Sequence, residues 1–183
     1  MKKKVLIFGF GSIGIRHANL LYKLKKISNV VVFSRRRINK FKSTNNIKDI
    51  LEYNPDYIVV CSETYQHHRS IKIIEKHFKN KIVLVEKPLF HKPVKLSFKH
   101  NKYYVGYNLR FHPVVKFLKN RIKQKEIFSV SIFCNSFLPK WRKNIDYFNS
   151  YSSSKTKGGG VLLDLSHEID YLQWLFGKVN KIE

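Results

Sequence analysis

The sequence contains few acidic residues: 12 aspartates and glutamates stand against 36 lysines and arginines, which gives a formal net charge of +24 over 183 residues. It also contains only two cysteines, Cys61 and Cys134, which lie far apart and form no C-x-x-C pair. This argues against a disulfide scaffold and is typical of a protein of the reducing cytoplasm. No run approaches the roughly 20 apolar residues of a membrane-spanning helix, so we expect no membrane partner.

The excess of positive charge would attract nucleic acid or another polyanion. However, the lysines are spread over nearly every segment and form neither a confined tail nor repeated basic and aromatic units. This distribution argues against nucleic-acid binding as the main function, because such proteins gather their charge on one face. With 43% hydrophobic residues the chain can bury a core, and its length predicts one large domain or one domain and part of another.

The first glycines of the chain form a recognisable pattern. Gly9, Gly11 and Gly14 spell G-x-G-x-x-G between a strand-like run at 4–8 and a helix-like run at 13–25. In a dinucleotide-binding loop the first glycine makes a tight turn, the second lets the backbone approach the pyrophosphate, and the third lets helix pack on strand. A basic start followed by an apolar stretch also begins a signal peptide, but a small-residue cleavage site is missing. We expect a dinucleotide loop, with a signal peptide or a chance glycine cluster as alternatives.

Apolar, β-branched runs alternate with helical patterns along the first part of the chain. Continuous apolar runs are typical of strands buried on both faces of a parallel sheet, and their alternation with helices predicts a doubly wound α/β domain over residues 1–118. The crossover at 88–102 is short and contains a proline, so we expect no full helix there. The predicted strands are 4–8, 30–34, 57–61, 82–85 and 102–106, and the predicted helices are 13–25, 47–53 and 65–77.

The pattern changes in the rest of the chain. Residues 126–137 alternate like a strand with one solvent-facing side, and residues 138–157 read as a polar loop. Three glycines at 158–160 precede one continuous helical pattern that Gly177 ends. We expect residues 119–183 to form the first part of an α+β substrate domain.

The second predicted strand ends in Ser34, Arg35, Arg36 and Arg37. A dinucleotide site usually has an acidic residue here for the ribose 2′-OH. An arginine can instead pair with a 2′-phosphate through two hydrogen bonds. We therefore predict NADP as the cofactor, with NAD as the alternative. A solvated basic turn is the competing interpretation in a chain so rich in lysine and arginine.

Lys87 lies in Glu86-Lys87-Pro88, directly after the fourth predicted strand. The carboxyl ends of parallel strands face the crevice where ligands bind, so a lysine here can reach a ligand. Taken alone, a charged residue after a strand is more often simply at the surface.

Asp164, His167 and Asp170 recur every three residues, which on one helix places them on one face. A histidine flanked by carboxylates can act as a general base near neutral pH, although a solvated polar stripe has the same pattern. We predict no metal site, because H-E-x-x-H is absent and the adjacent His67 and His68 would point apart on a helix.

Together these motifs resemble the glucose–fructose oxidoreductase / inositol dehydrogenase (Gfo/Idh/MocA) family of NAD(P)-dependent oxidoreductases. The resemblance rests on five motifs in order, GFGSIG, SETYQH, VEKPL, VGYNLRFHP and GGGVLLDLSHEID. Trp141-Arg142 and the following loop resemble a subgroup associated with surface-polysaccharide sugar metabolism. The resemblance implies a cytoplasmic Rossmann-type oxidoreductase that interconverts a secondary alcohol and a ketone on a sugar or sugar nucleotide.

The resemblance also implies roles for individual residues. Lys87 would be the catalytic lysine beside the nicotinamide, and His167 the general base that Asp164 orients. Thr64 and His67 would line the nicotinamide ribose and ring, Glu86 the cofactor side of the cleft, Asn108 and Arg110 the place where cofactor meets substrate, and Trp141 and Arg142 would close over the cofactor. The other residues expected at the cofactor are Gly9, Gly11, Ser12, Ile13, Gly14, Ser34, Arg35, Arg36 and Ser62.

The sequence departs from the family pattern in two places. Asp164 and His167 are three residues apart, where the family commonly has four, which weakens the assignment of Asp164. The family also continues with several strands, whereas this chain stops at Glu183, so Leu172, Leu175 and Phe176 would lack cover. We therefore expect a shortened chain, or a second copy or other partner over this helix. A dinucleotide-binding module without turnover is the alternative function, and a basic nucleic-acid-binding protein a third.

Overall fold

A computed structural model describes residues 2–122, 126–141 and 146–182. Its internal contacts divide the chain into two compact units. The N-terminal unit comprises Met1–Gly106 and Thr156–Gly158, and the C-terminal unit comprises Tyr107–Lys155 and Gly159–Glu183. Within the described residues, no helix is long and apolar enough to cross a membrane.

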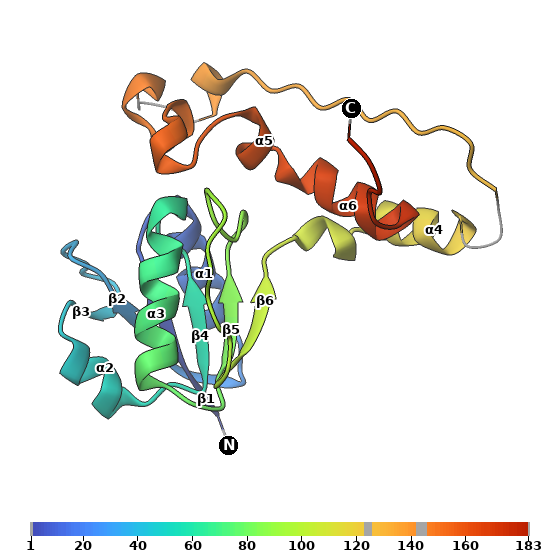
Figure 1. The fold of residues 1–183 in the computed structure, drawn as a ribbon. Helices are drawn as coiled ribbons and strands as arrows, with labels where there is room; N and C mark the ends of the chain where they lie inside the picture. Colours follow the sequence, from blue (N-terminus) through green and yellow to red (C-terminus); the bar gives the residue numbers. More distant parts are fainter. Residues whose placement is uncertain (1, 123–125, 142–145, 183) are drawn as a thin grey trace. The chain divides into compact units, whose positions relative to one another are not determined.

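The N-terminal unit is built on a six-stranded sheet in the order β3-β2-β1-β4-β5-β6, and every neighbouring pair is parallel (Figure 1). This confirms the predicted doubly wound fold. The order reverses at β1, which pairs with β2 on one side and with β4 on the other, so the crevice beyond the carboxyl ends of these strands is the topological switch point. The strands are β1 (Lys3–Phe8), β2 (Ile27–Phe33), β3 (Lys42–Thr44), β4 (Tyr57–Val60), β5 (Ile82–Val85) and β6 (Lys102–Val105).

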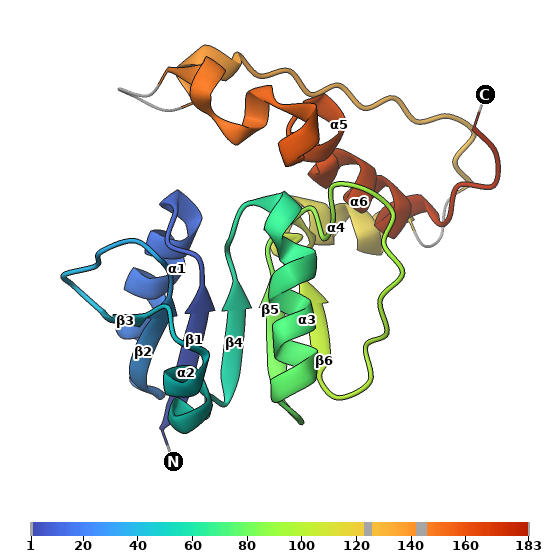
Figure 2. The ribbon, with the colours of Figure 1, turned by 60° about the vertical axis from the view of Figure 1, so that its left-hand side comes forward.

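Helices cover both faces of this sheet (Figures 1 and 2). Helix α1 (Ser12–Tyr22) packs on one face, where Val5 and Ile7 of β1 point, and α2 (Ile47–Tyr53) and α3 (His67–His77) pack on the other. A short 3₁₀ turn, η1 (Thr64–Gln66), precedes α3. Because the central strands are buried on both faces, their sequences are continuously apolar, and this made them predictable.

The structure differs from the prediction at the ends of some elements. β2 begins at Ile27, three residues before the predicted start, and the three-residue strand β3 is too short to leave a pattern in the sequence. Helix α1 ends at Tyr22, because the N–H groups of the next residues bond three positions back and tighten the last turn. The crossover at 88–101 contains no helix, as expected.

Glu75 of α3 holds the end of this crossover against the helix. Its carboxylate accepts hydrogen bonds from the backbone N–H of Lys99 at 2.9 Å and of His100 at 3.2 Å, from Asn101 Nδ2 at 2.9 Å and from the Tyr103 hydroxyl at 2.8 Å. Burial alone would raise the pKa of the Glu75 carboxyl, but these four bonds together lower it below its ordinary value. The carboxylate therefore anchors the end of the crossover to α3.

We expect Glu75→Gln to lower the free energy of unfolding at neutral pH by about 1–3 kcal/mol, because a charged acceptor of several hydrogen bonds is lost. A carboxyl whose pKa is depressed on folding stabilises the protein above its unfolded pKa, and this contribution is lost as the pH falls through the folded value. Urea unfolding of both proteins from neutral to acidic pH should show the difference shrinking. Glu52→Gln, at an exposed position of α2, is the control; a difference independent of pH would contradict this account.

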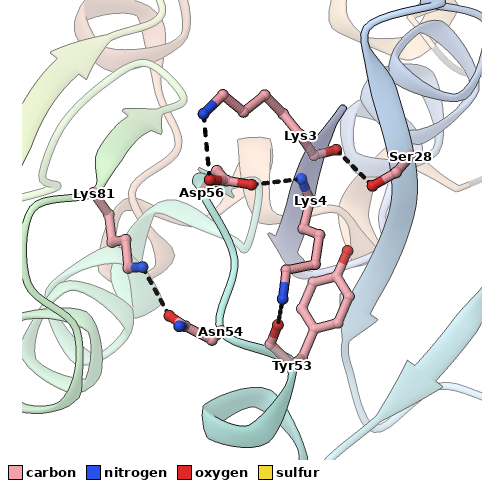
Figure 3. A network of polar contacts seen from close by, with 7 residues as sticks. All are labelled: Lys3, Lys4, Ser28, Tyr53, Asn54, Asp56 and Lys81. Carbon is pink, nitrogen blue, oxygen red and sulfur yellow. Dashed lines mark hydrogen bonds and ion pairs between the residues drawn. The ribbon is translucent and has the colours of Figure 1, made fainter. Parts of the chain in front are cut away.

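A second polar network lies at the amino ends of the strands (Figure 3). Asp56 accepts a hydrogen bond from the backbone N–H of Lys4 at 2.8 Å, and Lys4 Nζ donates to the carbonyl of Tyr53, the last residue of α2, at 2.6 Å. Lys81 Nζ donates to Asn54 Oδ1 at 2.8 Å. These contacts join β1, the α2–β4 turn and the start of β5, so some of the many lysines stabilise the fold away from the glycine loop.

The C-terminal unit is mostly helical. Its longer elements are η2 (Asn108–Phe111), α4 (Pro113–Ile122), α5 (Val161–Asp164) and α6 (Ser166–Phe176), and the polar stretch that was predicted as a loop contains single 3₁₀ turns. Helix α4 was not predicted. Leu175 is buried, so the expectation that it lacks cover is wrong, whereas Phe176 is 38% exposed.

Two further predictions for this unit are wrong. Residues 126–137 form no strand: Phe128 and Phe133 are 93% and 89% exposed, and a strand without a paired neighbour or a covered face is not stable. The helical pattern after the glycines is also interrupted at Leu165 (φ −101°, ψ 29°), which separates α5 from α6. Asp164 and His167 therefore lie on different helices, and the prediction of one shared helix face holds only for His167 and Asp170.

Candidate functional site

Gly9 and Gly14 bring three elements together at the switch point. Gly9 follows β1 with φ +89°, and a Cβ there would lie 2.7 Å from the Cα of Ser62, which follows β4. A Cβ on Gly14, in the first turn of α1, would lie 2.5 Å from the carbonyl oxygen of Gly9. Both positions therefore require glycine, the first for its backbone conformation and close approach, the second for the packing of α1 against the loop.

Gly11 has a different environment. It is the N-cap residue of α1 with φ −80° and ψ −170°, and a Cβ there would meet nothing within 4 Å. The fold therefore does not require a glycine at this position, and the space beside it is open. The first turn of α1 contains no acidic residue and no side-chain cap, so the N–H groups of Ser12, Ile13 and Gly14 have no acceptor within the helix. These donors and the positive end of the helix dipole fit a pyrophosphate.

Arg36 lies beside the glycine loop. Its backbone N–H donates to Ser34 Oγ at 3.1 Å, and its Nη1 donates to the carbonyl of Phe10, inside the loop, at 3.3 Å. Arg35 is exposed in the same turn. The turn after β2 therefore places the Arg36 guanidinium, and no carboxylate of residues 34–37, beside the glycine loop.

Lys87 follows β5 and is half-buried, and the Lys87–Pro88 peptide bond is cis. The segment after it is joined to the segment after β4 by His67, which is 1% exposed. His67 Nε2 lies 2.9 Å from the carbonyl oxygen of Ser62, and Nδ1 lies 3.1 Å from that of Leu89. Burial lowers the pKa of the His67 imidazole, although its bonds to backbone carbonyls oppose this. His67 thus ties two loops of the switch point, and its expected contact with the nicotinamide stays a prediction.

Thr64 is also buried, at 4% exposure, beside the glycine segment that is distant in sequence. Gly158, with φ +87°, belongs to the N-terminal unit, and a Cβ there would lie 3.0 Å from Thr64 Cβ and 2.8 Å from His91 Cβ. Thr64 therefore supports the packing of this segment, and its predicted contact with the nicotinamide ribose is untested.

His17 is a member of this site that the sequence analysis missed. Its Nε2 lies 2.6 Å from Glu86 Oε1, and the two side chains are 21% and 17% exposed. A Cβ on Gly106, at the end of β6, would lie 3.3 Å from the same carboxylate. Because His17 is one turn after Gly14 on α1 and Glu86 precedes Lys87, this pair connects the glycine-loop helix to the lysine segment. The signal in the sequence was a histidine three residues after the third glycine, on the same helix face.

In the C-terminal unit, His167 is half-buried and its ring meets that of Tyr107 edge to face, with 5.7 Å between centroids and 80° between planes. Asp170, one turn later on α6, forms a two-point ion pair with Arg110. Asp164 instead accepts hydrogen bonds from the backbone N–H of Gly160 at 3.2 Å and from the Ser152 hydroxyl at 3.4 Å, at the start of α5. The three predicted polar residues therefore have distinct surroundings.

Comparison with known families identifies this arrangement. Residues 3–97 match the Gfo/Idh/MocA oxidoreductase family, NAD-binding Rossmann fold, and residues 119–183 match the C-terminal alpha/beta domain of the same family. The chain belongs to this family. The family resemblance expected from the five motifs is thus confirmed. A comparison with curated protein sequences gave no match.

Solved structures share the Gfo/Idh/MocA fold of the chain. The WlbA (WbpB) dehydrogenase from Thermus thermophilus, in complex with NAD and UDP-GlcNAcA, is 19% identical with a TM-score of 0.69, over 100% of this chain and 66% of that one. The WlbA dehydrogenase from Bordetella pertussis, in complex with NADH and UDP-GlcNAcA, is 16% identical with a TM-score of 0.70, over 98% and 60%.

Scyllo-inositol dehydrogenase from Lactobacillus casei, with bound NAD(H) and scyllo-inositol, is 19% identical with a TM-score of 0.66, over 97% of this chain and 57% of that one. The chain thus spans about two thirds or less of the length of these solved structures. At these identities the likeness establishes the fold.

The remaining predicted site residues of this Gfo/Idh/MocA chain lie in the C-terminal unit. Asn108 is exposed in η2, and Trp141 is 39% exposed with its indole N–H donating to Ser136 Oγ. Arg142 lies outside the described residues. Among the residues that are described, no group of three or more His, Cys, Asp or Glu side chains could hold a metal ion.

Proposed function

We propose that this chain is an NADP-preferring oxidoreductase that interconverts a secondary alcohol and a ketone on a sugar or sugar nucleotide. The observation that carries the proposal is the glycine loop at the switch point, joined through His17 and Glu86 to the segment of Lys87. We further propose that it acts in the cytoplasm, in surface-polysaccharide sugar metabolism, and that residues 1–118 bind the cofactor and residues 119–183 the substrate.

The substrate class is supported by the relatives and by charge. Two WlbA dehydrogenases were solved with UDP-GlcNAcA and a third relative with scyllo-inositol. The net charge of +24 would draw an anionic substrate such as a sugar nucleotide toward the protein. A second copy of the chain is the partner we propose for the exposed Phe176 side of α6.

In this mechanism NADP, when bound, supplies the hydride acceptor. The free N–H groups of residues 12–14 bind its pyrophosphate, and Arg35 and Arg36 bind the 2′-phosphate. The ammonium group of Lys87 donates a hydrogen bond to the substrate hydroxyl oxygen and stabilises negative charge that develops there. His167 accepts the proton of that hydroxyl as a general base, and Asp164 supports it indirectly by fixing the start of α5.

The proposal is tested by titrating the full chain with NADPH and NADH, and then with a panel of UDP-sugars and inositols while the absorbance of the reduced nicotinamide is followed. Binding and turnover support an enzyme. Binding without turnover on any substrate favours the alternative, a dinucleotide-binding module. If an oligonucleotide binds instead and NADPH does not, the protein is a nucleic-acid binder.

The preference for NADP depends on the turn after β2. We expect Arg36→Ala to weaken NADPH binding about tenfold or more and to leave NADH binding nearly unchanged, because only NADPH carries the 2′-phosphate. Lys48→Ala, at an exposed position of α2, removes the same charge away from the loop and is the matched control. An equal loss of affinity for NADPH and NADH would show that the arginines form a solvated turn and do not bind the 2′-phosphate.

A further inference from the structure

One face of helix α6 packs against η2 and α4 of the same unit. His167, Asp170 and Trp174 are spaced by three and four residues, so they lie on the same side of the helix. The ring of His167 packs against Tyr107, and the carboxylate of Asp170 is bound by Arg110. Both of these contacts come from residues 107–110 (YNLR), which the resemblance places where cofactor meets substrate.

The Arg110–Asp170 contact constrains orientation as well as distance. Arg110 Nε lies 2.8 Å from Asp170 Oδ2, and Nη2 lies 2.5 Å from Oδ1, so both carboxylate oxygens accept from one edge of the guanidinium. The Asp170 side chain is 7% exposed, and Arg110 is the cation paired with it. A planar two-point pair of this kind resists rotation, because turning α6 about its axis would break both bonds together.

The other end of the same face is held independently. Lys119 of α4 donates from Nζ to the carbonyl of Trp174, and its ammonium lies 5.2 Å from the centre of the Trp174 ring. With the far end of α6 fixed in this way, the Arg110–Asp170 pair determines the direction of the first turn. His167 lies in that turn, three residues before Asp170.

We infer that Arg110 is a positioning residue: through Asp170 it fixes the rotation of α6 and so holds the imidazole of His167 against Tyr107. The inference rests on the proposed function in so far as His167 is the general base. It gives Arg110 a role different from the contact between cofactor and substrate that the resemblance implies. Asp170 occupies the Nε/Nη2 edge of the guanidinium, which is one of its two edges that can bind an oxyanion at two points.

The test follows the ring signals of His167 by NMR in the full chain with labelled histidine, assigned among the eight histidines by His167→Gln. In the wild type, the Tyr107 ring current shifts the His167 signals, and Tyr107→Phe keeps this shift while Tyr107→Leu removes it. Arg110→Met should move the His167 signals toward their positions in Tyr107→Leu. NADPH affinity, measured on the same samples, should stay within about twofold of the wild type.

If Arg110→Met leaves a buried charge and does not fold, the double variant Arg110→Met, Asp170→Leu removes both charges and keeps the apolar volume. It should fold and still lose the shift. Unchanged His167 signals in either folded variant overturn the inference, as does a tenfold loss of NADPH affinity without movement of His167, which would make Arg110 a cofactor ligand.

Turnover separates this inference from the proposed function. If His167 is the base, Arg110→Met should lower kcat about tenfold to a hundredfold with little change in the KM for NADPH, because a misdirected base affects chemistry more than binding. If His167→Gln turns over like the wild type, the proposed role of His167 fails. The NMR signals of Arg110→Met still decide, in that case, whether Arg110 positions the ring.

Discussion

Gly14→Ala is expected to destabilise the N-terminal unit by about 3 kcal/mol and to abolish dinucleotide binding with it. A Cβ at this position would lie 2.5 Å from the carbonyl oxygen of Gly9, and the neighbouring atoms are backbone that cannot move aside without displacing α1 from β1. Urea unfolding and NADPH titration of the same samples measure the two effects.

Gly11→Ala is the matched control for that variant and separates folding from binding. Its backbone is extended and a Cβ would meet nothing within 4 Å, so its stability should equal or slightly exceed that of the wild type. NADPH affinity should nevertheless fall about a hundredfold, since the methyl group occupies the space through which the pyrophosphate approaches the backbone. A stable Gly11→Ala protein that binds NADPH like the wild type would contradict the assignment of the loop.

Lys87→Met is expected to lower kcat by about a hundredfold to ten-thousandfold and to leave NADPH affinity within about twofold. In the proposed mechanism the ammonium group acts on charge that develops at the substrate oxygen, while the glycine loop provides most of the cofactor binding. Steady-state rates on the best substrate and NADPH titration measure the two quantities.

Lys92→Met, an exposed lysine a few residues further along the same segment, removes the same charge and should change neither quantity. The account is contradicted if Lys87→Met retains the wild-type kcat. A parallel loss of affinity and rate in that variant would instead make Lys87 a residue that binds the cofactor.

The N-terminal unit could be predicted well from sequence because its signals are local. The central strands are buried on both faces, which makes their sequences continuously apolar, and the glycine at position 14 is required by a contact with Gly9 inside the same loop. The pair of His17 and Glu86 could not be predicted in the same way. It joins residues 69 positions apart, and only the packing of α1 on the sheet brings them together.

The C-terminal unit was predicted less well, for two physical reasons. Residues 126–137 alternate like a strand, but alternation records only which side chains could be buried and does not supply a neighbouring strand. The interruption at Leu165 leaves the apolar pattern unbroken, so nothing in the periodicity reveals it. The use of Arg110 as a partner of Asp170 depends on how η2 lies against α6, which spacing along the chain does not give.

The central claim is that the loop between β1 and α1 binds a dinucleotide, and backbone amide NMR signals during NADPH titration test it most directly. We predict that the largest shifts fall on the amides of residues 9–14, with smaller shifts at Arg36 and Lys87, and that Gly11→Ala loses them. Unshifted amides at residues 9–14 under saturating NADPH would contradict the claim.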